Sequence, residues 1–189
     1  MAADYPRGFK PAYHLSGGLI RMNRYTIADS YATSIFYGDL VKATGTTKGI
    51  QLSTSGDSPV GVFAGCNYTA ANGEFKWSRY WPASTDTIGT ATAYVWDDPN
   101  IVFECQSDAA VAVTQIGELF DIVTTHSGST ITGQSGMELD VGASTNDDLV
   151  LMDIIERAGN AAGQSNVDVH VLLNLHAYQN GGAARVAAV

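Results

Sequence analysis

The chain has 189 residues, of which 45% are hydrophobic and 15% charged, so it can bury a sizeable core and is too apolar for a disordered chain. Its formal net charge of −9 disfavours direct binding to nucleic-acid phosphates. No apolar run reaches the roughly 20 residues that span a bilayer, and the first residues lack the apolar core of a signal peptide. We therefore expect a soluble protein made in a cytoplasm, with no membrane partner.

Residues 1–36 show no clean helical or strand periodicity, and we expect an extended arm here with at most one short strand. The arm is basic although the protein is acidic, so its cations are either solvated or docked on an acidic neighbour. A docked arm would become ordered only on binding. The competing interpretation places a strand of the main domain at residues 12–30. The residues assigned to partner binding are Arg7, Phe9, Lys10, Tyr13, Arg21 and Arg24.

Residues 37–178 consist of short apolar runs separated by turn residues. This pattern predicts an all-β domain, either a β-barrel or a sandwich of short antiparallel strands, followed by a flexible tail at residues 179–189. The predicted strand at 101–105 closely follows a strand that runs from residue 87 to the turn at Asp98-Pro99, and we expect the two strands to form a hairpin. The remaining predicted strands are residues 40–43, 50–53, 59–66, 75–81, 119–124, 149–156 and 167–175.

Particular residues sharpen this prediction. Asn72-Gly73 is the strongest hairpin signal, because a type I′ turn needs positive φ at both central residues. Gly61 and Gly65 leave room for a neighbouring backbone or a bulge. Residues 108–115 are rich in alanine and follow Ser107, a good capping residue, and they predict one short helix.

The aromatic strand after Asn72 has three possible roles: core packing, a protein interface, or stacking on a sugar. Its alternation places Phe75 and Trp77 on one face with two later residues, Arg79 and Trp81. Aromatic residues and arginine dominate protein-binding hot spots. The residues assigned to an interface are Trp77, Arg79, Tyr80 and Trp81.

Motifs for catalysis or metal binding are not found in the sequence, and we expect neither an enzyme nor a cofactor. Asp97 and Asp98 point to opposite sides of an extended chain, and the following Pro99 favours a turn. His170 and His176 are about 20 Å apart along a strand, too far to share one metal ion. The two cysteines lie in apolar runs, and the sequence leaves open whether they pair.

The order of several segments carries a family resemblance. "GDLV", "SPVGVFAGCNY", "WPAST" and "DDPN" are followed by "IGELFDI", "SGMELD" and "VDVHVLLNLHAY". Over residues 37–178 this order resembles the capsid decoration, or cement, proteins of tailed phages, often marine ones. The resemblance implies a non-catalytic β-domain on the outer surface of the virion head. Its implied structural positions are Asp98, Pro99, Phe103 and Gln106.

The resemblance further implies that the partner is the major capsid protein and that the chain is a homo-oligomer on the capsid, with a trimer as one form. Two other roles remain open from the residues alone. One is a carbohydrate-binding β-module, which the aromatic strand would serve. The other is a different part of the virion, such as a fibre base.

Overall fold

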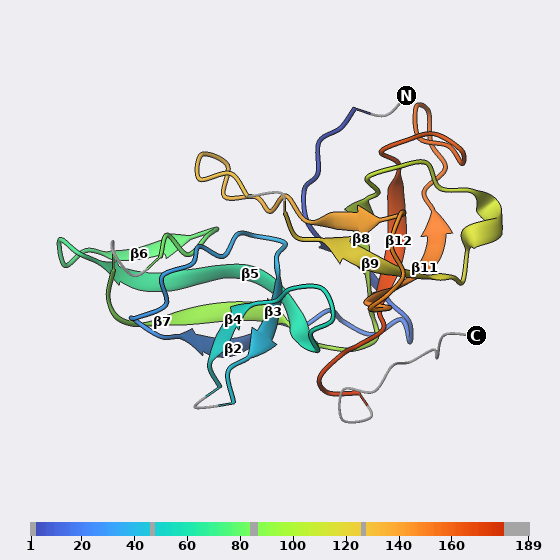
Figure 1. Cartoon of the computed structure of the whole chain (residues 1–189). Coiled ribbons are helices and arrows are strands. Elements are labelled where there is room, and N and C mark those ends of the chain that lie inside the picture. Colours follow the sequence, from blue (N-terminus) through green and yellow to red (C-terminus); the bar gives the residue numbers. More distant parts are fainter. Residues whose placement is uncertain (1–2, 46–47, 84–86, 126–127, 180–189) are drawn as a thin grey trace.

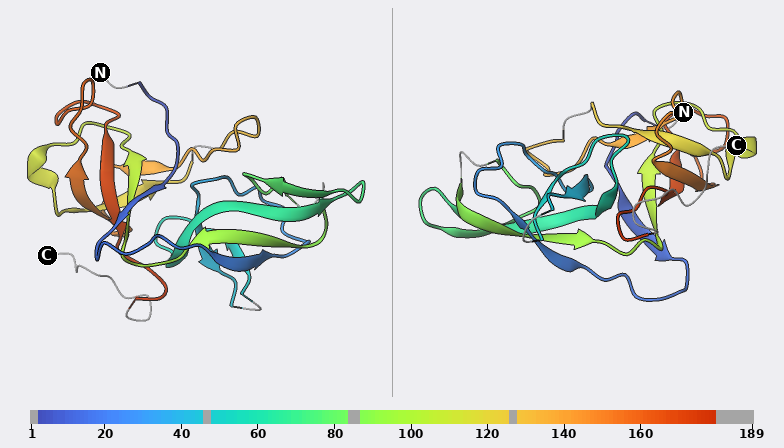
Figure 2. Two further views of the ribbon diagram at one scale, coloured as in Figure 1. Left: turned by 180° about the vertical axis from the view of Figure 1, so that it is seen from behind. Right: turned by 60° about the horizontal axis from the view of Figure 1, so that its bottom comes forward.

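A computed structural model describes residues 3–45, 48–83, 87–125 and 128–179 (Figure 1). The described chain is built almost entirely from two antiparallel β-sheets that pack together, which confirms the predicted all-β class. The sheets form an open sandwich rather than a closed barrel. They lie side by side along the longest dimension of the molecule, so each sheet also has surface that the other leaves uncovered (Figure 1; Figure 2).

Sheet I has six strands in the order β1-β8-β12-β11-β9-β10. The short β10 was not predicted, because three residues are too few to show alternation. The bounds of the strands are Lys10–His14 (β1), Ile101–Gln106 (β8), Asp168–Leu173 (β12), Leu149–Ile154 (β11), Leu119–Val123 (β9) and Glu138–Asp140 (β10).

Sheet II has the order β2-β7-β5-β3-β4, and β6 pairs with the far half of β5. A single parallel bridge between Thr26 and Gly49 brings the β4 end of the sheet back to β2, so the sheet is strongly curled. The bounds are Asn23–Ile27 (β2), Thr87–Trp96 (β7), Pro59–Ala70 (β5), Leu40–Ala43 (β3), Ile50–Leu52 (β4) and Phe75–Ser78 (β6).

The N-terminal segment is part of the fold and is not an extended arm. Strand β1 pairs with β8 in sheet I, and β2 pairs with β7 in sheet II. Phe9 and Ile27 are fully buried in the cores of the two sheets. The domain therefore does not begin at residue 37. Each of these strands has only five residues, and so few residues give a weak periodic signal.

The expected helix at residues 108–115 is also absent, and a 3₁₀ turn at Val113–Gln115 is the helical structure found there. Side chains at the proposed helix start bond to neighbouring segments instead of capping a helix. Ser107 Oγ accepts the backbone N–H of Val167, and Asp108 Oδ1 accepts that of Val141. These tertiary hydrogen bonds hold the segment in an extended path, because local propensity is weaker than such contacts.

The residues between β7 and β8 connect the two sheets, so the predicted hairpin between these strands is wrong. The predicted turn is present: Asp98 Oδ1 accepts the backbone N–H of Asn100 at 2.9 Å. Asp97 points the other way and is buried. Its carboxylate accepts hydrogen bonds from Asn23 Nδ2 and, at 2.7 Å, from Tyr25 Oη. The adjacent acids thus fasten the crossover and β2, and they do not share a site.

The hairpin at Asn72-Gly73 joins β5 to β6 as predicted, but its turn is of another type. Gly73 has a φ of 84°, whereas Asn72 is not among the described residues with positive φ. The loop closes with a hydrogen bond from Gly73 N to Ala70 O and another from Ala70 N to Glu74 O. One glycine therefore meets the conformational demand of this turn.

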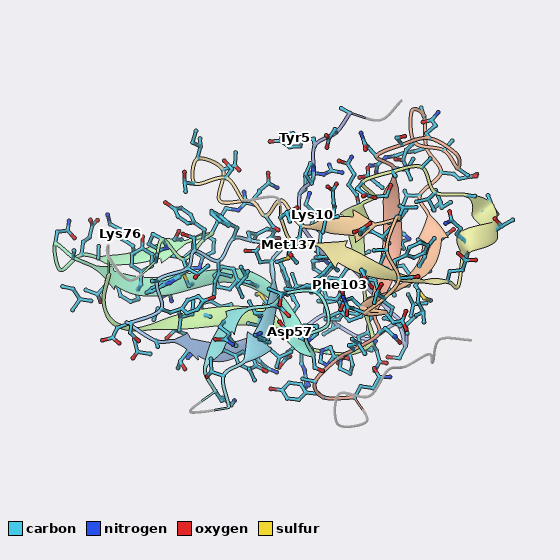
Figure 3. All side chains as sticks on the ribbon, viewed as in Figure 1. Tyr5, Lys10, Asp57, Lys76, Phe103 and Met137 are labelled. Atoms are coloured by element: carbon cyan, nitrogen blue, oxygen red, sulfur yellow. The ribbon has the colours of Figure 1, made fainter. Side chains whose placement is uncertain are left out.

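Two hydrophobic cores meet at β5. Val62 and Ala64 face the larger core, which lies between the two sheets and also contains Phe103 and Met137 (Figure 3). Phe63 faces the smaller core inside sheet II. The cysteines are divided between these cores as buried free thiols, Cys66 in sheet II and Cys105 in sheet I. Burial raises the pKa of the Cys66 thiol to about 12.

A buried carboxyl lies at the junction of the sheets. Asp39 is 4% exposed, its Oδ2 accepts the backbone N–H of Phe36 at 2.7 Å, and its main-chain oxygen accepts that of Phe63. Burial raises the pKa of Asp39 to about 6, although hydrogen bonds from Phe36 and Ser135 oppose the rise.

A substitution at Gly61 tests how closely β5 must approach the connection between β7 and β8. A Cβ built on this glycine would lie 2.0 Å from the main-chain oxygen of Trp96, and its φ is 152°. Gly61→Ala should therefore lower the free energy of unfolding by about 3 kcal/mol or more, measured by urea denaturation. Gly18→Ala is the control, since its nearest neighbour would be 3.4 Å away. Equal stability of the two variants would contradict this account of β5.

Asp39→Asn tests the junction. The unfolded carboxyl has a pKa of 3.8 and the folded one about 6, so the folded state retains a proton that the unfolded chain releases. The stability this proton contributes is complete below pH 3.8 and is lost as the pH rises through 6. At pH 7.5 the variant should exceed wild type in stability by up to about 3 kcal/mol. A wild-type minus variant difference in unfolding free energy that does not change between pH 4 and 7.5 would refute this assignment.

Candidate interaction surface

Strand β6 lies where sheet II extends beyond sheet I (Figure 2), and it carries the most exposed aromatic side chains of the described strands. Phe75 and Trp77 of β6 are 70% and 60% exposed, and Ile88 of β7 is 55% exposed. Thr69 of β5 is the register partner of both Phe75 and Ile88. Directly paired residues project to the same side of a sheet, so these side chains share one face.

A second row of side chains continues this face. Trp77 pairs with Asn67, which pairs with Thr92 of β7. Asn67 Nδ2 donates to the hydroxyl of Tyr94 at 3.0 Å, and these side chains are half-buried. We call this surface the open face. It consists of Arg24, Asn67, Thr69, Phe75, Trp77, Ile88, Thr92 and Tyr94.

A glycine creates the space on which the Trp77 ring rests. A Cβ on Gly65 would lie 3.2 Å from Cζ2 of Trp77, so the indole lies directly against the β5 backbone. Gly65 has a φ of 127°, which a residue with a side chain rarely adopts. The backbone thus supports one side of the ring, while the other side remains available for contact.

Arginine side chains border the open face. Arg24 of β2 is exposed and pairs in register with Tyr94, which places it on the same side of the sheet. Arg79 is exposed at the junction side, and its guanidinium lies 4.6 Å from the ring centre of Tyr37. Lys76 lies near the outer end of sheet II, where it forms an ion pair with Glu74 (Figure 3).

Of the four predicted interface residues, two are exposed, one is half-buried and one is fully buried. Trp77 and Arg79 are exposed. Trp81 is fully buried, and its Nε1 donates to the main-chain oxygen of Tyr31 at 3.1 Å, so it cannot be an interface anchor. Tyr80 is half-buried and stacks on Phe36. Because β6 ends at Ser78, the alternation assumed across this segment does not extend to Trp81.

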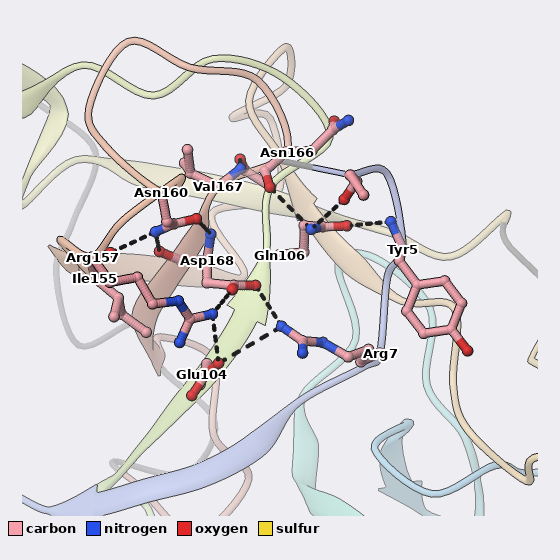
Figure 4. A network of polar contacts seen from close by, with 12 residues as sticks. Tyr5, Arg7, Glu104, Gln106, Ile155, Arg157, Asn160, Asn166, Val167 and Asp168 are labelled. Atoms are coloured by element: carbon pink, nitrogen blue, oxygen red, sulfur yellow. Dashed lines mark hydrogen bonds and ion pairs between the residues drawn. The ribbon is translucent and has the colours of Figure 1, made fainter. Parts of the chain in front are cut away.

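Arg7 belongs to an internal network on sheet I (Figure 4). It donates to Asp168 Oδ1 at 2.7 Å, Arg157 binds the other carboxylate oxygen, and Glu104 lies 3.8 Å from both guanidinium groups. Nearby, Gln106 Oε1 accepts the backbone N–H of Tyr5. This network fastens the N-terminal segment to β8 and β12.

The other residues assigned to a binding arm are dispersed. Phe9 is a core residue, and Lys10 pairs with Glu104 across β1 and β8, with its pKa lowered chiefly by burial. Tyr13 is 43% exposed and meets His170 edge to face. Arg21 and Arg24 are exposed near β2. Of this set, Arg24 is the residue that reaches the open face.

The described residues do not form a metal site of three or more His, Cys, Asp or Glu side chains. His176 is buried beyond the end of β12, so it does not share a strand face with His170, and His126 lies outside the described residues. Within the described ranges, no helix has the length and apolar character needed to cross a membrane.

Comparisons of this chain with protein-family models, with curated proteins and with solved structures found no match.

Proposed function

We propose that this protein is a structural virion protein that binds the outside of a tailed-phage head and stabilises its lattice, using the open face of sheet II. The observation that supports a binding role is the cluster of Phe75, Trp77 and Ile88 on one uncovered sheet surface. The order of sequence segments that resembles capsid decoration proteins supports the choice of partner, the major capsid protein.

The open face has the composition of a protein interface. Trp77 is a large ring that is already supported by backbone on one side, so it loses little conformational freedom when a partner covers it. Phe75 and Ile88 extend the apolar surface on either side of Thr69. Arg24 adds a charged donor at the border. An apolar centre with a polar rim is typical of protein–protein contacts.

The edge position of β6 also suits assembly. This strand pairs with β5 on one side, and in the described chain no strand pairs with its other side. It is only four residues long, which limits strand-to-strand aggregation. Binding through side chains of the open face is therefore favoured over extension of the sheet.

A carbohydrate-binding module is the second candidate function. The observation that favours it is the row in which Trp77 lies beside Asn67 and Thr92, with the Tyr94 hydroxyl nearby. A flat aromatic ring next to hydrogen-bonding side chains can stack on a sugar and bind its hydroxyl groups. The two proposals predict different ligands for the same surface.

Trp77→Ala tests the proposed function in a co-sedimentation assay with phage heads lacking this protein. Wild type should bind saturably. The variant should lose about 2 kcal/mol or more of binding free energy, which is about 30-fold in Kd, because hot-spot residues at interfaces are commonly aromatic. Phe75→Ala should weaken binding in the same direction. Both variants should melt close to wild type, since the two side chains are 60% and 70% exposed.

Val113→Ala is the matched control, because Val113 is also 60% exposed but lies on the sheet I side. It should bind as wild type does. Wild-type protein that does not bind heads would contradict the proposed function. Binding of oligosaccharides that is lost in Trp77→Ala, without binding to heads, would support the carbohydrate-binding module instead.

A further inference from the structure

Charge is divided unequally between the two sheets. Residues 15–97, which supply sheet II, contain six acidic and six basic residues. Residues 3–14 and 98–179, which supply sheet I, contain thirteen acidic and three basic residues. The sheet I half therefore has a formal charge of −10, whereas the sheet II half is neutral.

The cations of the sheet I half are already engaged with acidic neighbours. Arg7 and Arg157 both bind Asp168, and Lys10 pairs in register with Glu104. With thirteen acidic and three basic residues, this half has many more carboxylates than cations that could neutralise them. The exposed ones include Asp108, Glu118, Asp153 and Glu156. The surface of this half is therefore strongly negative.

The open face has the opposite character. Among the described residues of its rows there is no acidic side chain, and the exposed guanidinium of Arg24 lies at its border. Arg79 adds a second exposed guanidinium toward the junction, where it faces the ring of Tyr37 and forms none of the ion pairs found in the described chain. A cationic and apolar surface thus lies at one end of a molecule whose other end repels anions.

We propose that the protein binds the head with the open face of sheet II against the shell and the acidic sheet I half directed outward. The shell surface under the open face should present apolar side chains flanked by carboxylates. Complementary charge orients two molecules as they meet, and like charge opposes the reverse orientation. This inference rests on the proposed function and adds which side binds and what it binds.

A second copy of the chain fits the open face less well than the shell does. Two open faces related by a twofold axis would bring the same patch together, so the Arg24 and Arg79 cations would add on both sides of the contact. Contacts between sheet I halves would oppose formal charges of −10. We therefore assign the open face to the shell and expect contacts between copies to use other surfaces.

A cysteine-labelling experiment tests the orientation. Ile88→Cys places a thiol on the open face, and Val113→Cys places one on the sheet I side, at sites that are 55% and 60% exposed. The native Cys66 and Cys105 are buried and should not compete for a maleimide reagent. In free protein both new thiols should react. On decorated heads Ile88→Cys should be protected and Val113→Cys should react as before.

A charge-reversal experiment tests the chemistry of the partner. Arg24→Glu should weaken binding to heads by at least about tenfold at low salt, and added salt should reduce the difference from wild type. Glu118→Lys also reverses one exposed charge, but on the outward side, and should bind as wild type does. Equal loss of binding in both variants would show that overall charge, and not the open face, controls docking.

The outcomes separate the two proposals. No binding of wild type to heads would contradict the proposed function itself. Binding in which Val113→Cys is protected and Ile88→Cys reacts would leave that function standing and overturn the orientation. A wild-type protein whose own oligomer protects Ile88→Cys before any head is added would assign the open face to a second copy and also overturn the inference.

Discussion

The fold depends on β5, because this long strand pairs with β3, β6 and β7 and supplies side chains to both hydrophobic cores. Val62 and Ala64 pack with sheet I, while Phe63 and Cys66 pack inside sheet II. With both of its faces buried, β5 lies very close to the backbone at Trp96 and Asp97, where β7 leads into the crossover to sheet I. Gly61 permits this close approach because it has no side chain. The register shift after Phe63 then changes which residues of β5 face each core.

Sheet I covers only part of β5, and the uncovered part carries the open face. Its first eight residues are buried, and the next three are half-buried, because sheet I does not extend over the far part of sheet II. Strand β6 pairs with this far part and carries Phe75 and Trp77. The aromatic surface is therefore not a defect of packing. It is the part of a two-sided sheet that the other described segments leave uncovered, and under the proposed function a binding partner would cover it.

Much of the strand content could be predicted from local patterns, and much of the pairing could not. The run from Pro59 to Cys66 and the hairpin at Asn72-Gly73 carry strong local signals, and both are present. The pairing of β8 with β12 joins segments some 60 residues apart, and it replaces the hairpin expected from proximity. Ile88 was missed as a candidate site residue because its place across β5 from Phe75 depends on the register that both residues share with Thr69.

The sequence by itself determined the all-β class and the turn at Asp98, because these follow from residue type and the nearest neighbours along the chain. The tertiary structure decided which tryptophan is exposed and which is core: Trp77 lies on the open face and Trp81 is buried. The tertiary structure also shows that the segment expected to be a basic arm forms strands of both sheets. The physical reason is that burial against distant strands, rather than local periodicity, supplies most of the free energy that places a short segment.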